Sequence, residues 1–264
     1  MASDSARSTP TGNLTGTALI TGATAGIGHA FAVRLARRGH DLVLVARDTA
    51  RLEVVAAALR AEHGVEVEAI TADLVQPDQL AAVEARLADP ARPVALLVNN
   101  AGFGLKKRFL DNPIEAENAM LDVLVTAVLR LTHAALGPMT ERGHGGIINV
   151  SSVAAFLPRG TYSATKAWVN SFTEWAANEY RSQGVTVMAL CPGFTKTEFH
   201  QRMEVARGTN FMWLDVDFLV EKALADFEKG RIYSIPGAQY KTVVALTRLV
   251  PNKALQAFQG IGRK

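Results

Sequence analysis

A tyrosine and a lysine stand four residues apart, at Tyr162 and Lys166, in a segment with helical periodicity. Residues at this spacing share one helical face, so the lysine charge would favour the phenolate and lower the tyrosine pKa from about 10. Such a tyrosine can act as a general acid near neutrality. Carbonyl reduction needs one, because hydride delivered to the carbonyl carbon leaves an alkoxide that must be protonated. Ser152, at the end of a predicted strand, would supply a hydroxyl that polarises the carbonyl oxygen.

A second group of residues has the arrangement of a dinucleotide-binding turn. A short apolar run over residues 17–20 predicts a buried parallel strand. Gly22, Gly26 and Gly28 follow it and lead into a predicted helix over residues 27–38. Glycines allow the backbone to approach a pyrophosphate, and the helix N-terminus offers free N–H groups. The spacing is G-x-x-x-G-x-G rather than the commoner G-x-G-x-x-G, so the turn alone is a weak signal.

Strand and helix signals alternate along the chain that must position these residues. Predicted strands cover residues 17–20, 41–46, 65–71, 94–102, 145–152, 185–190 and 231–236. Predicted helices cover residues 27–38, 48–62, 76–88, 114–136, 162–181 and 216–228. Repeated βα units with near-continuous apolar strands predict an α/β fold, a doubly wound parallel sheet of Rossmann type with ligands at the carboxyl ends of the strands.

The composition predicts one ordinary α/β domain. We expect residues 1–15 to be a loose tail, residues 16–237 the Rossmann-type domain, and residues 238–264 a basic helical extension of that domain. The single cysteine, Cys191, excludes a disulfide framework and fits a reducing, cytoplasmic location. No apolar run is expected to reach the ~18 residues of a membrane span, and the N-terminus has no apolar core like that of a signal peptide.

Charge and histidine content exclude two further classes of site. The formal net charge is only +3, which argues against a nucleic-acid-binding protein, and the six histidines show no metal-binding spacing. Residues 239–258 alternate apolar and basic positions with a break near Pro251. We expect two short helices there, lying over the substrate side or a neighbouring subunit; a segment lying on an anionic membrane surface is the alternative.

Four motifs together resemble the short-chain dehydrogenase/reductase family over residues 14–237. They are TGATAGIG (21–28), NNAG (99–102), YSATK (162–166) and PGFTKT (192–197). The resemblance implies a single Rossmann-type domain, a nicotinamide cofactor, and carbonyl/alcohol interconversion by hydride transfer. It implies catalytic roles for Ser152, Tyr162 and Lys166, with the lysine also holding the nicotinamide ribose. Ser152 is selected over Ser151 because family members commonly place the catalytic serine before a small apolar residue.

The resemblance also implies a set of cofactor contacts. These are Gly22, Thr24, Gly26, Ile27, Gly28, Arg47, Asp73, Leu74, Asn99, Ala101, Gly102, Tyr162, Lys166, Pro192, Gly193, Phe194, Thr195 and Thr197. Asp73 resembles the acid on the adenine side. Thr197 would contact the nicotinamide amide through its side chain, and backbone groups near Phe194 and Thr195 would contact it too.

Arg47 predicts NADP(H) rather than NAD(H). An acidic residue at the end of the second strand would bind the ribose 2′-hydroxyl of NAD, but Ala46 stands at that place and Arg47 follows it. A guanidinium matches a 2′-phosphate, and Thr24 could add a hydroxyl to the same phosphate. Asp48 is acidic but fits the cap of the following helix.

One position departs from the family, and two segments bear on the substrate. Leu124 stands where many relatives carry an asparagine that helps to hold a water leading to the lysine. Leucine cannot hydrogen-bond, so the proton relay must run differently. Residues 198–214 are rich in large apolar side chains and predict either a mobile apolar cover or a packed helix pair. The basic run at residues 106–108 (Lys106, Lys107 and Arg108) could meet a phosphate on a carrier-bound acyl substrate, or could simply be solvated.

The sequence therefore predicts an oxidoreductase that reduces a small-molecule carbonyl, an apolar ketone or aldehyde, with NADPH. A 3-oxoacyl thioester (ketoacyl) reductase is the alternative within this class. A non-catalytic NADP(H)-binding sensor or scaffold is the alternative from another class; Leu124 favours it, and the retention of Ser152, Tyr162 and Lys166 argues against it. The family also implies a homodimer or homotetramer, with the helix that bears the tyrosine and its neighbour at the interface.

Overall fold

A seven-stranded parallel sheet is the centre of the molecule. The structure is a computed structural model that describes residues 15–197 and 211–249. The strand order is β3-β2-β1-β4-β5-β6-β7, and every neighbouring pair is parallel. The strands are β1 (Thr17–Thr21), β2 (Leu42–Ala46), β3 (Val67–Thr71), β4 (Val94–Asn99), β5 (Gly145–Val150), β6 (Val185–Leu190) and β7 (Tyr233–Ser234). The predicted doubly wound sheet of Rossmann type is confirmed.

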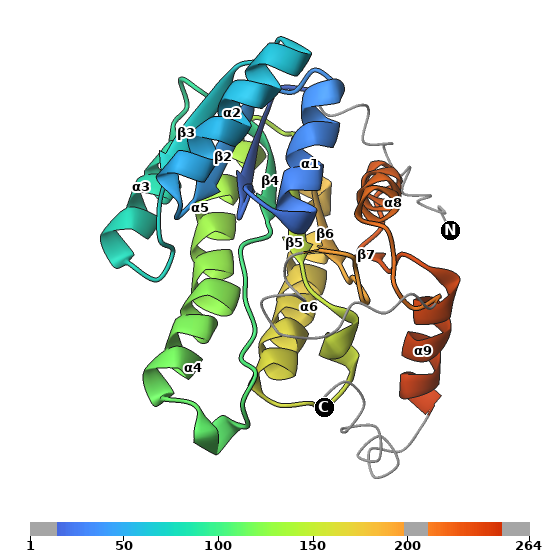
Figure 1. Ribbon diagram of the computed structural model, residues 1–264. Coiled ribbons are helices and arrows are strands. Elements are labelled where there is room, and N and C mark those ends of the chain that lie inside the picture. Colours follow the sequence, from blue (N-terminus) through green and yellow to red (C-terminus); the bar gives the residue numbers. More distant parts are fainter. Residues whose placement is uncertain (1–14, 198–210, 250–264) are drawn as a thin grey trace, which may run out of the picture.

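Helices cover both faces of the sheet (Figure 1). They are α1 (Gly26–Arg37), α2 (Thr49–His63), α3 (Pro77–Ala88), α4 (Ile114–Leu121), α5 (Ala127–Glu141), α6 (Thr161–Tyr180), α8 (Val216–Glu228) and α9 (Ala238–Leu249). Successive strand residues point to opposite faces, so Ile20 of β1 packs with α1, α2 and α8 while Leu19 packs with α3, α5 and α6. Burial on both faces explains why the central strands are mainly apolar, whereas the edge strand β3 is only partly buried and contains Glu68.

The helix predicted over residues 114–136 contains a π-helical turn. The turn spans Asp122–Thr126 and joins α4 to α5, so that one helical run extends from Ile114 to Glu141. By length and composition this run could cross a membrane, contrary to the expectation that no segment would do so. Half of its apolar window is buried, and α5 packs on β4 and β5. The core of the α/β domain therefore accounts for its apolar character.

Three strands, β4, β5 and β7, end earlier than the sequence predicts, and the ends of β4 and β5 lie at the candidate site. β4 ends at Asn99 because the next two N–H groups, of Asn100 and Ala101, donate to the Thr21 hydroxyl (3.0 Å each). β5 ends at Val150, and Ser152 instead caps a short 3₁₀ turn by accepting from Ala154 N (3.1 Å).

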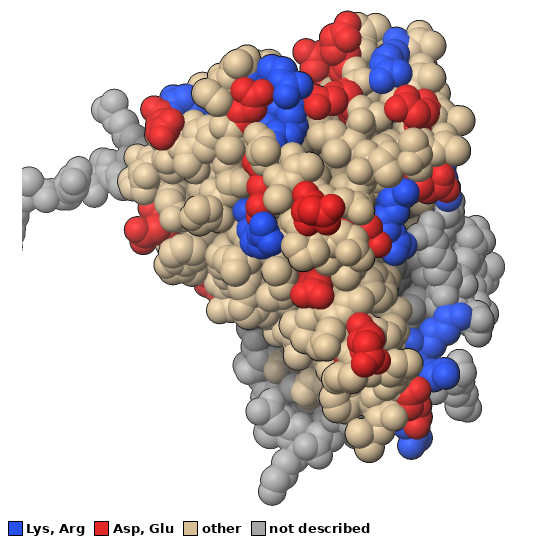
Figure 2. Space-filling view, turned by 90° about the vertical axis from the view of Figure 1, so that its left-hand side faces the viewer, with Lys and Arg blue, Asp and Glu red and all other residues tan. Residues whose placement is uncertain are grey.

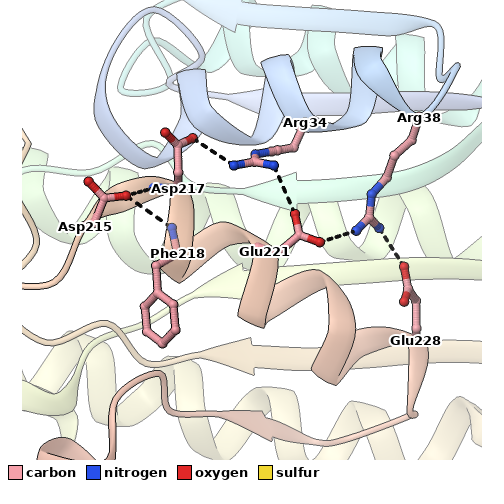
Figure 3. Close-up of polar contacts among 7 residues, drawn as sticks. All are labelled: Arg34, Arg38, Asp215, Asp217, Phe218, Glu221 and Glu228. Carbon is pink, nitrogen blue, oxygen red and sulfur yellow. Dashed lines mark hydrogen bonds and ion pairs between the residues drawn. The ribbon is translucent and has the colours of Figure 1, made fainter.

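Ion pairs join α1 to α8 (Figure 3). Glu221 of α8 pairs with Arg34 (3.3 Å) and Arg38 (3.2 Å), and Arg38 also reaches Glu228 (2.6 Å). Asp215 caps α8 by accepting from two N–H groups of its first turn. Exposed pairs contribute little singly, but two arginines sharing Glu221 hold α8 in a defined place on α1, the helix that begins at the glycine-rich turn.

Charged side chains of both signs are mixed on the face shown in Figure 2. Elsewhere in the structure an ion pair joins α5 to α3, where Arg130 donates to Glu84 (2.7 Å). Of the predicted C-terminal helix pair, α9 accounts for the first member. The second member, the predicted tail up to residue 14, and residues 198–210 of the predicted apolar cover lie outside the described residues.

Candidate active site

The glycine-rich turn between β1 and α1 has a shape that fits a pyrophosphate. Gly22 (φ 66°) and Gly26 (φ 56°) are in the left-handed region. A Cβ at Gly28 would lie 2.3 Å from the Gly22 carbonyl oxygen, so the turn closes tightly only without side chains. No side chain caps the first turn of α1, which leaves its N–H groups and dipole for an anion. Thr24 and Ile27 lie within this turn, half-buried.

Asn100 holds this turn in place, a role that the sequence prediction missed. Its Nδ2 donates to the carbonyl oxygens of Thr21 (2.9 Å) and Gly22 (3.2 Å). A Cβ at Gly22 would lie 3.0 Å from the Ala101 Cα, so the NNAG segment lies directly against the turn. Asn100 belongs to that motif, and the motif was the signal that could have found it.

The Asn99 side chain is engaged inside the protein, beside the candidate site. Its side chain is buried and donates to Asn149 (2.9 Å) and Thr132 (3.2 Å), while Asn149 donates to Thr173 (3.0 Å). This row of buried polar groups connects α5, β4, β5 and α6. The Asn99 side chain thus supports the helix that carries Tyr162 and Lys166, and a cofactor contact at this position would have to come from the backbone.

Ser152, Tyr162 and Lys166 come together at the carboxyl end of β5. Gly160 (φ 96°) turns the chain into α6, which places Tyr162 in its first turn and Lys166 one turn later. The Tyr162 and Ser152 side chains are hydrogen-bonded. The Lys166 Nζ donates to the Val150 carbonyl (2.7 Å) and lies 5.8 Å from the centroid of the Tyr162 ring.

Burial dominates the pKa of each of these two groups. Burial raises the pKa of Tyr162 to about 12, and the hydrogen bond between Tyr162 and Ser152 opposes this. Burial lowers the pKa of Lys166 to about 8. In the free protein the tyrosine pKa is therefore raised, whereas helical spacing alone predicted that the lysine would lower it. Tyr162 is a protonated phenol at neutral pH, which is the form that an acid needs.

Ser151 has a structural place rather than a position beside the tyrosine. It is buried, and its Oγ donates to the Lys166 carbonyl (3.0 Å). Leu124 lies in the π-helical turn, 1% exposed. A Cβ at Gly102 would be 2.7 Å from Leu124 Cδ2, so the leucine packs on the backbone of the NNAG segment.

The candidate contacts on the adenosine side lie at the ends of β2 and β3. Arg47 is exposed directly after β2, and Asp48 caps α2 by accepting from Arg51 N (3.0 Å). Asp73 is half-buried after β3 and accepts from Val75 N (3.2 Å). Leu74 lines a small hollow together with Asn99, Ala101 and neighbouring residues of α5 and the π-helical turn.

The segment after β6 also contacts the glycine-rich turn, at Gly26, whereas the NNAG segment contacts it at Gly22. Pro192 accepts from Val153 N (2.9 Å), and Thr195 Oγ1 donates to the Gly193 carbonyl (3.0 Å). A Cβ added at Gly26 would lie 3.2 Å from the Thr197 Cβ. Within residues 15–197 and 211–249, no group of three or more His, Cys, Asp or Glu could hold a metal ion.

Comparisons with known sequences agree on one family. The family model described as short chain dehydrogenase matches residues 16–207. Very-long-chain 3-oxoacyl-CoA reductase-A of Danio rerio is 35% identical over 189 residues, which are 69% of this chain and 58% of that protein. Serine 3-dehydrogenase of Rhizobium radiobacter is 35% identical over 190 residues, 70% of this chain and 74% of that protein. The match spans only 58% to 60% of the length of the very-long-chain 3-oxoacyl-CoA reductases of Danio rerio and Homo sapiens.

Solved structures show the same relationship over nearly the whole chain. A short-chain dehydrogenase from Sphingobium yanoikuyae in complex with NADPH has a TM-score of 0.82 and 39% identity, covering 93% of this chain and 95% of that one. The bulky-bulky ketone specific alcohol dehydrogenase from Comamonas testosteroni has a TM-score of 0.78 and 34% identity, covering 91% and 93%.

Proposed function

Because the chain belongs to the short-chain dehydrogenase family, we propose that it reduces a carbonyl group to an alcohol with NADPH. The observation that carries the proposal is the cluster of Ser152, Tyr162 and Lys166 at the end of β5. In a parallel sheet the carboxyl ends of β1, β4 and β5 share one edge. The cluster and the glycine-rich turn therefore open into the same crevice.

Each residue of the cluster has a distinct task in this reaction. Tyr162, protonated at neutral pH, donates the proton that the alkoxide requires. Ser152, its hydrogen-bonding partner, donates to the substrate oxygen and stabilises its growing charge. The Lys166 ammonium favours the phenolate that remains after proton transfer. When bound, the nicotinamide supplies the hydride.

The choice of NADPH over NADH rests on the end of β2. Ala46, the last residue of the strand, has no group that could bind a ribose hydroxyl or repel a phosphate, and the Arg47 guanidinium is exposed beside it. The side chain of Asp48 is engaged in capping α2, so its carboxylate does not take the place of the missing acid. The similar structure from Sphingobium yanoikuyae contains NADPH.

An apolar ketone is the proposed substrate. Phe194 packs against Trp213 (ring centroids 5.4 Å apart), and Phe156 packs near Tyr233 (6.5 Å). Phe156 follows β5 and Phe194 follows β6, whose carboxyl ends lie at the candidate site, whereas Tyr233 begins β7 and Trp213 precedes α8. The similarity to a bulky-bulky ketone specific enzyme supports the same class.

A 3-oxoacyl thioester is the second candidate substrate. The basic run at residues 106–108 is exposed on the loop after the NNAG segment, where it could meet the phosphates of a carrier. The Danio rerio relative is named for this chemistry.

A substrate panel with NADPH tests these proposals. Bulky ketones, aldehydes and 3-oxoacyl-CoA thioesters of increasing length should be compared by the loss of NADPH absorbance. We expect turnover with apolar ketones, and Tyr162→Phe is the control for background oxidation. NADPH binding without turnover of any carbonyl would favour the sensor or scaffold, which Leu124 suggests.

We also propose a homodimer or homotetramer through α5 and α6. Leu129 of α5 and Trp175 of α6 are large apolar side chains that are 43% and 52% exposed. Light scattering on the purified protein would measure the assembly, and a monomer at all concentrations would contradict it.

A further inference from the structure

One tyrosine of the C-terminal helix bonds to two separate segments beside the candidate site. Tyr240 lies in the first turn of α9, and 2% of its surface is exposed. Its hydroxyl accepts from Phe194 N (2.8 Å) and donates to the Met212 carbonyl (2.5 Å). Burial raises the pKa of Tyr240, so the hydroxyl keeps the proton that the second bond needs. Phe194 follows β6 and Met212 precedes α8, so a single side chain ties these segments together.

The ring of Tyr240 packs as closely as its hydroxyl bonds. A Cβ at Gly193 would lie 2.0 Å from the Tyr240 Cζ, so the ring occupies the space where a side chain at 193 would stand. Leu214 continues the connection, because its N–H donates to the Phe194 carbonyl (2.8 Å) and its carbonyl accepts from Lys196 N (3.0 Å). Gln239 of α9 adds a bond from Nε2 to the Phe211 carbonyl (3.0 Å). The first turn of α9 thus fixes residues 193–196 and 211–214 against each other.

These contacts bear on the cofactor because the same segment reaches the glycine-rich turn. Thr197 packs beside Gly26, so a shift of residues 193–197 changes the groups that face the first turn of α1. We propose that Tyr240 is a positioning residue for the cofactor: its hydroxyl holds the Gly193–Thr197 segment over the glycine-rich turn. The proposal rests on the proposed function, since it takes this turn to bind NADPH.

The geometry also changes one predicted contact. Backbone groups near Phe194 and Thr195 were predicted to contact the nicotinamide amide, and one of them, the Phe194 N–H, is engaged by Tyr240. The amide must therefore be received by other groups of the segment, and the extension after residue 237 takes part in shaping the site rather than only covering it.

Tyr240→Phe tests this role, because it keeps the ring against Gly193 and removes both hydroxyl bonds. Thr242→Val is the matched control: it removes a hydroxyl bond to the Ala238 carbonyl within the same helix. NADPH binding should be measured by fluorescence titration, and amide hydrogen exchange at Phe194 should be measured in the free protein. We expect Tyr240→Phe to raise the NADPH Kd about five- to thirtyfold, the effect of leaving one or two hydrogen-bonding groups unpaired. Exchange at Phe194 should accelerate, while Thr242→Val changes neither.

The two readouts separate this role from general stability and from the proposed function. Unchanged exchange at Phe194, or faster exchange with an unchanged NADPH Kd, would overturn the positioning role. Equal losses of NADPH affinity in both variants would show that only the stability of α9 matters, and would overturn it too. If the wild type turns over ketones and Tyr240→Phe binds NADPH equally tightly, the proposed function stands although the positioning role fails. If the wild type binds no dinucleotide, both proposals are overturned.

Discussion

Lys166→Met should abolish turnover with NADPH and leave the free energy of unfolding almost unchanged near pH 7. The lysine is 5% exposed, and burial lowers its pKa from 10.5 to about 8. A lysine with a lower pKa in the folded than in the unfolded chain destabilises the folded state wherever it is charged in both. Methionine fills similar space without a charge, so its substitution removes that cost.

The magnitude follows from two opposing terms. The lowered pKa corresponds to about 3 kcal/mol of lost stability near pH 7, at about 1.4 kcal/mol for each pKa unit. Methionine leaves the buried Val150 carbonyl without the Nζ donor, which costs about 1–3 kcal/mol. The two effects have opposite signs and similar size, so the variant should lie within about 2 kcal/mol of the wild type near pH 7.

The pH dependence gives the sharper test. The cost of burial is complete below pH 8, falls as pH rises from about 8 to 10.5, and is absent above. Between about pH 7 and pH 10 the wild type should gain about 2–3 kcal/mol relative to Lys166→Met. Urea unfolding followed by tryptophan fluorescence at both pH values measures this difference, and other titrating groups cancel. Lys229→Met, at an exposed lysine after α8, controls for the loss of a charge. A difference that is the same at both pH values would refute the reasoning.

Three further substitutions test the site. Tyr162→Phe should abolish turnover while NADPH still binds, because the glycine-rich turn is untouched; near-normal activity would disprove its role as acid. Arg47→Ala should reduce the preference for NADPH over NADH about ten- to a hundredfold in Kd, since a charge-assisted hydrogen bond contributes about 1.5–3 kcal/mol. Gly28→Ala should prevent the binding of either dinucleotide, because its Cβ would lie 2.3 Å from the Gly22 carbonyl oxygen and the turn would have to open. Calorimetry would measure the loss of binding, and an unchanged circular dichroism spectrum would show that the variant still folds.

Local patterns in the sequence were enough to predict the fold and the order of its elements. A strand buried on both faces is mainly apolar, as β2 is, and most of the strands are followed by a segment with helical periodicity. The spacing of Tyr162 and Lys166 also reflects local geometry, because residues four apart on a helix are neighbours. These features depend on residues close in sequence.

The supports of the site could not be predicted in this way. Asn99 and Asn100 are adjacent, yet the Asn99 side chain joins the buried row of polar groups and the Asn100 side chain binds the glycine-rich turn. The residue at which β4 ends decides which asparagine takes which role. Tyr240 meets Phe194 only in the folded chain. The raised pKa of Tyr162 follows from burial, which spacing along a helix does not reveal.

Leu124 and the lowered pKa of Lys166 together bear on how Tyr162 regains its proton. Leu124 is buried and offers no hydrogen-bonding group where many relatives have an asparagine that helps to hold a water. After each turnover Tyr162 must regain a proton that comes in the end from solvent, and Leu124 cannot hold a water on that route. Burial lowers the pKa of Lys166, which makes its ammonium a readier proton donor. A proton that passes from the ammonium toward the phenolate must be returned to the lysine by solvent in every cycle, so Lys166 relays the proton rather than supplying it. Its Nζ lies 5.8 Å from the centroid of the Tyr162 ring, near enough for a relay through one bridging group.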